Sequence, residues 1–273
     1  MERIAVFLFV IHVVVSTYDF EYGAESDHSP PRWKYTPGWG HCGDSHQSPI
    51  NINTQLVTES DGIPEFQLKG SRDIQVDGHF ENNGHAPTFL IDSDSVGKLQ
   101  LLSEGKAYDF RNLHFHFGVD PNIGSEHSVN GMFHPAEAHL VHTGTDNGIV
   151  VIAVFLTLQE DGFGEQNTEV TQIMKDYIKN ITKPDDRTPA VIRPYNILPD
   201  NPHFFTYSGS LTTPPCTEQV RWIVMQEPII ISGKSLAILR SIYGHEGPMS
   251  DDGNRRPIQR KDEADVSVGE LNL

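Results

Sequence analysis

Short segments in which polar and apolar residues alternate with period two recur along the chain. Successive side chains of a β-strand point to opposite faces, so this alternation predicts half-buried strands. It occurs at residues 51–53, 66–68 and 74–76. Residues 149–156 instead form a continuous, β-branched apolar run, and residues 221–225 are similar. Such runs are typical of central strands that are buried on both faces.

Two other segments have the spacing of helices. Apolar residues recur at i, i+3, i+4, i+7, i+8 and i+11 over residues 170–181, with Asn167 or Thr168 as the cap. Ser232 caps a second predicted helix, which stops at Gly244. The apolar face of this second helix consists of Leu236, Leu239 and Tyr243.

Many strands with few helices predict the α+β class, with a large, mostly antiparallel sheet and a few short peripheral helices. Residues 32–262 contain no linker, repeat or low-complexity run, so a single domain is expected there. A polar, flexible lead-in is expected at residues 17–31, and an acidic tail at residues 263–273.

The charge balance excludes two classes of partner. The 273 residues include 20 Lys and Arg against 37 Asp and Glu, a net charge of −17. Nucleic acids and anionic membrane surfaces both require clustered basic residues, so neither is expected as a partner. With 37% hydrophobic residues, the composition is that of an ordinary globular protein.

The N-terminal region indicates secretion. Residues 4–15 are apolar except for His12, and the run is too short to span a bilayer, so a signal peptide is predicted at residues 1–16. The alternative is a buried N-terminal strand. In an extracellular protein, Cys42 and Cys216 predict one disulfide, the alternative being two free thiols. Asn180 begins a glycosylation sequon.

The most informative segment for chemistry places two histidines two residues apart, at His114 and His116. On a strand they share one face, and a neighbouring strand can bring His139 beside them. Three imidazoles with a fourth position open form a catalytic zinc arrangement, in which Glu137 can orient a ligand ring. By spacing alone, a pair of surface strand histidines is an equal alternative. The metalloprotease and serine-hydrolase motifs are absent.

Several motifs, in order, resemble the alpha-class carbonic anhydrases. They span most of the chain, from Trp33 to Pro257, and lie at residues 47–52, 82–86, 113–118, 124–129, 137–142, 209–216 and 254–257. The resemblance implies a large, central, twisted and largely antiparallel sheet with short helices around it. It also implies reversible hydration of carbon dioxide to bicarbonate and a proton, through attack by zinc-bound hydroxide.

The resemblance assigns roles to individual residues. His114, His116 and His139 match the zinc ligands, and the residues that orient them match Asn112, Glu137 and the backbone of Asn254. Thr212 matches the threonine that accepts a hydrogen bond from the hydroxide, Glu126 its proton acceptor, and His85 the proton shuttle. The residues that match the substrate pocket are Val141, Val151, Leu211, Thr212, Thr213, Val220 and Trp222.

Other features of the family carry over with a few departures. Cys42 and Cys216 match the disulfide of secreted members, and the family implies sulfonamide-type and anionic inhibitors. Three positions depart from the usual residues near the metal, namely Asn112, Phe117 and Thr143. Two other functions remain open: an inactive binding module related to the family, and an acidic protein that binds calcium or mineral. Inactive relatives lose zinc ligands, whereas this chain keeps all three.

Overall fold

The computed structural model describes residues 19–58, 63–158, 166–259 and 266–273. The predicted signal peptide at residues 1–16 lies outside the described residues. Within them, no helix is both long and apolar enough to cross a membrane.

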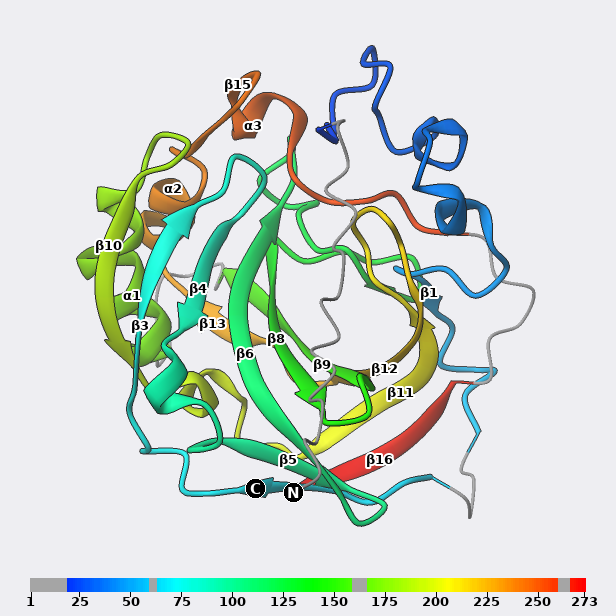
Figure 1. Cartoon of the computed structure of the whole chain (residues 1–273), viewed down its shortest axis with the longest axis vertical. Coiled ribbons are helices and arrows are strands. Elements are labelled where there is room, and N and C mark those ends of the chain that lie inside the picture. The colour runs from blue at the N-terminus through cyan, green and yellow to red at the C-terminus, as the bar shows by residue number, and fades with distance from the viewer. Residues whose placement is uncertain (1–18, 59–62, 159–165, 260–265) are drawn as a thin grey trace, which may run out of the picture.

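A twelve-stranded, twisted sheet forms the centre of the molecule (Figure 1). Its strands are β2 (Phe66–Lys69), β3 (Val76–Asn82), β4 (Pro87–Ile91), β5 (Gln100–Ser103), β6 (Lys106–Phe117), β8 (Ala136–Gly144), β9 (Ile149–Leu158), β10 (Arg187–Ile192), β11 (His203–Ser210), β12 (Glu218–Met225), β13 (Ile229–Ile231) and β16 (Ser267–Asn272). Two small sheets pair β1 (Asn51–Ile52) with β7 (Ser128–Val129) and β14 (Tyr243–Gly244) with β15 (Gly247–Pro248).

The sheet is mixed, so the expectation of a mostly antiparallel sheet is wrong in this respect. β9 runs parallel to both β12 and β13, and β16 runs parallel to β2. For β9 the physical reason is burial of its side chains on both faces, which is typical of parallel strands. This burial confirms the prediction of a central strand at residues 149–156.

Short helices surround the sheet. They are α1 (Thr168–Asp176), α2 (Gly233–Leu239), α3 (Met249–Asp252) and the 3₁₀ turns η1 (Trp33–Tyr35), η2 (Gly40–Gly43), η3 (Ser93–Ser95), η4 (Ile178–Asn180) and η5 (Pro194–Ile197). Asn167 caps α1 and Ser232 caps α2, each accepting a hydrogen bond from a backbone N–H three residues later. Both predicted helices are confirmed, although α1 ends at Asp176 rather than at residue 181.

The placement of Tyr243 on the second helix is wrong. α2 ends at Leu239, and Tyr243 lies in β14 with 49% of its surface exposed. Its backbone N–H donates to the carbonyl of Thr182, so the chain leaves the helix to pair elsewhere.

The side chains of β9 divide the core into two clusters. Val150, Ile152, Val154 and Leu156 face the larger cluster, which α1 and α2 also cover. Val151, Ala153 and Phe155 face a smaller cluster against β11 and β12. Burial of a side chain of this size contributes roughly 1.5–3 kcal/mol to the free energy of unfolding, so β9 is held firmly in the centre of the sheet.

The N-terminal segment packs onto the domain, in contrast to the flexible lead-in expected at residues 17–31. Phe20 and Tyr22 contact Trp33 edge-to-face, with ring centroids 5.6 Å and 5.8 Å apart. The aromatic cluster also includes the disulfide between Cys42 and Cys216, which confirms that prediction. This disulfide closes a loop of 174 positions, for which the chain-entropy relation gives about 5 kcal/mol of stabilisation at most.

The expected acidic tail instead contributes a strand. β16 lies between β11 and β2 at the lower edge of the view in Figure 1. Leu271 is buried there, and its neighbours in the strand are at least partly exposed. The domain therefore extends to the last residues of the chain rather than ending at residue 262.

Candidate metal centre

The histidines of the predicted metal site lie on two neighbouring central strands. β6 and β8 are antiparallel, and their register places His114 directly opposite His139. His116 lies two residues further along β6 and therefore on the same face as His114. Phe115 points to the other face and joins the larger core cluster. The sheet thus brings His139 beside the pair on β6, which the spacing alone had left open.

The three imidazoles converge closely. One ring nitrogen from each of His114, His116 and His139 lies within 4.8 Å of the other two. The ring centroids are 5.1 Å apart for His114 with either partner and 4.6 Å apart for His116 with His139. His116 and His139 are buried, and His114 is partly exposed.

Each imidazole donates a hydrogen bond through one nitrogen, which fixes the role of the other. Nδ1 of His114 donates to Oδ1 of Asn112 at 2.9 Å. Nδ1 of His116 donates to the backbone carbonyl of Asn254 at 2.6 Å, and Nε2 of His139 donates to Oε1 of Glu137 at 2.7 Å. Nε2 of His114, Nε2 of His116 and Nδ1 of His139 therefore carry the lone pairs.

These lone pairs fit a divalent metal ion. Nε2 of His116 is buried and has no hydrogen-bond partner among the described residues, an arrangement that costs free energy unless a ligand fills it. Burial lowers the pKa of His114 and of His139, and the other imidazoles of the cluster add to this effect. Neutral imidazoles are the form that binds metal, and three of them with an open position suit zinc.

A buried network behind His139 was not predicted from the sequence. His127 donates to Glu137 twice, from its backbone N–H at 2.9 Å and from Nδ1 at 2.7 Å. Its Nε2 lies 2.7 Å from the hydroxyl of Tyr207, which donates to Ser48. Burial raises the pKa of Glu137, but His127 and His139 outweigh it and hold the pKa well below its usual value. The carboxylate that orients His139 is therefore ionised.

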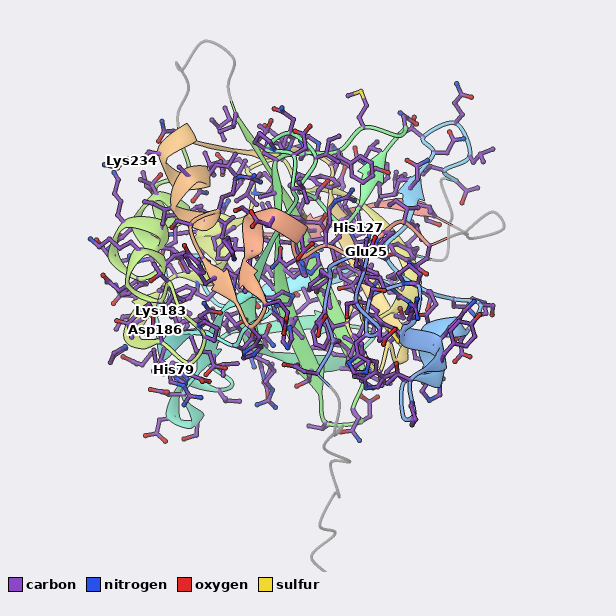
Figure 2. The ribbon with its side chains drawn as sticks, turned by 90° about the horizontal axis from the view of Figure 1, so that it is seen from above. Glu25, His79, His127, Lys183, Asp186 and Lys234 are labelled. Carbon is purple, nitrogen blue, oxygen red and sulfur yellow. A yellow bond between two sulfur atoms is a disulfide. The ribbon has the colours of Figure 1, made fainter. Side chains whose placement is uncertain are left out.

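His127 was within reach of sequence reasoning, but its partners were not. It belongs to the motif at residues 124–129, whereas Tyr207 is 80 residues away and no local pattern connects the two. Figure 2 labels His127 within the body of the molecule, in contrast to Lys234 of α2 at the outer edge.

Asn254 organises more of the site than the backbone role expected of it. Its side-chain amide donates to the carbonyls of Phe115 and His85, at 2.9 Å and 3.0 Å. Its Oδ1 accepts from the backbone N–H of Phe117 at 2.7 Å, while its carbonyl accepts from His116. One residue therefore ties a histidine of the triad to the turn that carries His85.

Glu126 and Thr212 are both buried, but they form no hydrogen bond with each other. Oε1 of Glu126 accepts from the backbone N–H of Arg256 at 2.9 Å. None of the described residues donates to the other oxygen of Glu126. This unpartnered acceptor is where the expected donation from the Thr212 hydroxyl would go.

The residues expected to form an apolar wall gather in one cluster. Val151, Val220 and Trp222 are buried together, and Val141 and Leu211 pack against them while partly exposed. The Trp222 ring lies 4.9 Å from the ring of His139, so the wall adjoins the imidazoles. Thr213 is half-buried in the loop between β11 and β12, next to Thr212.

His85 lies in the turn between β3 and β4, where Asn254 holds its carbonyl. Its ring stacks on Phe20 at 3.8 Å, and its Nε2 lies 2.8 Å from Oδ1 of Asp19. Burial lowers the pKa of His85, and Asp19 opposes the shift. The sequence did not predict these contacts of His85, because Asp19 is 66 residues away in the segment expected to be flexible.

The departures from the family's usual residues leave the triad intact. Asn112 is shorter than the usual residue, yet its amide oxygen reaches His114. Phe117 is buried in the larger core cluster. Thr143 accepts a hydrogen bond from Arg111 at 2.6 Å.

The chain is similar to known proteins over most of its length. The sequence model of the family described as eukaryotic-type carbonic anhydrase matches residues 28–269. Carbonic anhydrase 6 of Mus musculus is 31% identical over 255 residues, covering 87% of this chain and 77% of the relative. A carbonic anhydrase-related protein of Rattus norvegicus is 30% identical over 214 residues, covering 73% and 72% respectively.

A solved structure extends the likeness to the fold. It is the complex of the alpha-carbonic anhydrase from Thermovibrio ammonificans with the inhibitor sulfanilamide. The match has a TM-score of 0.73 at 28% identity, and it covers 92% of this chain and 100% of that one. These findings confirm the resemblance that the motifs indicated: the chain belongs to the eukaryotic-type carbonic anhydrase family and is one of its enzymes.

Proposed function

We propose that this protein catalyses the zinc-dependent, reversible hydration of carbon dioxide to bicarbonate and a proton. One observation carries the proposal: three imidazoles converge, each donates through one nitrogen, and buried Nε2 of His116 has no partner in the described part of the chain. This is the ligand set of a catalytic zinc site, with three protein nitrogens and a fourth position for water.

His114, His116 and His139 would hold the metal. Zinc in a three-histidine site supplies a nucleophile by lowering the pKa of its bound water to about 7, a value established for the carbonic anhydrases themselves. Asn112, Asn254 and Glu137 keep the three rings in the orientation that faces their lone pairs inward. Such outer hydrogen bonds commonly sustain both affinity and activity.

The other residues would position the substrate. The wall of Val141, Val151, Leu211, Val220 and Trp222 offers carbon dioxide a surface without charge, which suits an apolar gas. The hydroxyl of Thr212 would donate a hydrogen bond to the unpartnered oxygen of Glu126. The oxygen of Thr212 can then only accept a hydrogen bond. Thr212 therefore selects a nucleophile that donates its single hydrogen to this oxygen and directs a lone pair at the substrate.

His85 would carry the proton away from the site. An imidazole accepts and releases protons near neutral pH, which water does poorly. The amide of Asn254 links the backbone of His85 to the triad, and this supports a fixed distance between the two.

We also propose secretion and inhibitor binding. The disulfide between Cys42 and Cys216 supports an oxidising compartment. Sulfanilamide, bound to the similar enzyme of Thermovibrio ammonificans, is a suitable probe of the site. Glycosylation of Asn180 remains a prediction, and its side chain is exposed.

The test is stopped-flow hydration of carbon dioxide by the purified protein before chelation, after removal of metal, and after return of one equivalent of zinc. We expect rapid hydration before chelation, no hydration after the metal is removed, and recovery of the rate when zinc is returned. Zinc binding without hydration would contradict the proposal and indicate a binding module. Hydration that persists without metal would contradict the role of the triad.

A further inference from the structure

A second group of metal-ligating side chains lies apart from the triad, around His85. Asp19 comes from the N-terminal segment, His85 from the turn between β3 and β4, and His245 from the turn between β14 and β15. One ligand atom of each lies within 4.8 Å of the other two. A cavity of about 440 Å³ adjoins the group and is lined in part by His85 and His245.

The Asp19 carboxylate lies between the two rings. Its Oδ1 is 2.8 Å from Nε2 of His85, and its Oδ2 is 3.6 Å from Nε2 of His245. The ring centroids of the two histidines are 5.5 Å apart. Tetrahedral ligands about 2.0–2.1 Å from zinc are separated by about 3.3 Å from each other, which falls between these two distances.

The surroundings hold the two rings in place. Phe20 stacks on His85 with an interplanar angle of 16°. His245 packs against Gly84, where a Cβ atom would collide with its ring and where φ is +83°. Only glycine meets both conditions without strain. The turn at Gly84 therefore leaves room for the ring of His245.

Other exposed histidine–carboxylate pairs lack this convergence. His203 lies 3.4 Å from Glu270, with side chains 49% and 68% exposed. No second histidine joins that pair among the groups found in the described residues. Two imidazoles and one carboxylate are a ligand set that binds zinc and copper, whereas one of each binds weakly.

We propose that Asp19, His85 and His245 form a second metal site, which binds a zinc or copper(II) ion more weakly than the triad does. The ion would occupy Nε2 of His85. One consequence rests on the proposed function. When metal is in excess, an ion in the second site removes His85 from proton transfer and slows the hydration of carbon dioxide.

Isothermal titration of the tag-free protein, already holding one zinc, with further zinc tests the binding directly. We expect a second, saturable site that weakens by at least about tenfold in Asp19→Asn and in His245→Gln, because each removes a ligand. His203→Gln is the matched control and should titrate like the wild type. Absence of the second site, or unchanged binding in both variants, would overturn the proposal.

Hydration rates in dilute, bulky buffer test the consequence separately. Added zinc should lower kcat of the wild type, imidazole buffer should restore it, and His245→Gln should keep its rate over the same zinc range. A wild-type rate that stays constant while calorimetry shows the site filled would overturn the consequence. A protein that binds both zinc ions but never hydrates carbon dioxide would overturn the proposed function and leave the second site standing.

Discussion

The two histidine groups of this protein differ in how the fold assembles them. The triad lies on β6 and β8, adjacent strands in the middle of the sheet, and two of its members are buried. Asp19, His85 and His245, called the rim group below, come from one terminal segment and two turns, and their side chains are 58%, 17% and 40% exposed. Ligands on paired strands are positioned more precisely than ligands on turns and terminal segments.

The hydrogen bonds of the two groups sharpen the contrast. Every ring of the triad has one nitrogen held by an oxygen outside the metal position. In the rim group, the hydrogen bond of His85 and the 3.6 Å contact of His245 both go to Asp19 itself. A metal at the rim must therefore replace existing contacts, while one in the triad fills an unsatisfied position. The difference predicts tight binding in the first group and weak binding in the second.

The largest expected effect is that of His139→Ala. Removing one of three ligands leaves a weak two-histidine site, so both zinc and hydration activity should be lost. Metal analysis together with stopped-flow hydration measures both. His245→Gln, which changes only the rim, should retain the tightly bound zinc. A His139→Ala protein with full metal and full rate would show that the ligand assignment is wrong.

A smaller loss is expected from Thr212→Val, which removes one hydroxyl and keeps the shape. The kcat/KM for carbon dioxide should fall by roughly 10²–10³, the usual effect of removing one positioned hydrogen-bonding group. Zinc content should not change, and sulfanilamide should bind more weakly. Thr217→Val, an exposed threonine of the same loop, is the control. Equal inhibition constants for Thr212→Val and the wild type would contradict the role of this hydroxyl.

Glu137→Gln tests the support behind the triad. The amide can still accept from His139 but carries no charge, so zinc affinity should fall by about 10–100-fold. Competition with a chelator measures this. Glu169→Gln is the control, because it changes another buried glutamate, which contacts Arg193 and lies in α1, and it should hold zinc like the wild type. If Glu137→Gln also held zinc as tightly as the wild type, the network through His127 would have no part in metal binding.

The smallest expected effect is that of His85→Ala. The kcat for hydration should fall several-fold in weak buffer, because the proton then leaves by way of water. The kcat/KM should stay nearly constant, since it reports the steps up to bicarbonate release. Small imidazole buffers should restore the lost rate. An unchanged kcat in dilute, bulky buffer would show that the proton takes another path.

Local patterns predicted the parts of the site that lie within a few residues of each other. The alternation around His114 and His116, and Glu137 two residues before His139, follow directly from strand geometry. The caps at Asn167 and Ser232 are equally local.

Contacts between distant segments could not be predicted in this way. The amide of Asn254 reaches His85, 169 residues away, and no periodicity encodes that contact. The parallel pairing of β16 with β2 and the packing of Phe20 on His85 depend on the whole fold. The polar composition of residues 17–31 predicted flexibility, although Phe20 and Tyr22 in this segment pack against Trp33.

Zinc K-edge X-ray absorption on the protein loaded with one equivalent of zinc tests the central claim most directly. The account predicts three imidazole nitrogens and one further light atom at about 2.0–2.1 Å, with one zinc per chain. The same measurement on His116→Ala should lose this signature. A shell of two imidazoles and a carboxylate would place the ion at the rim, and would contradict the assignment of the triad as the catalytic metal site.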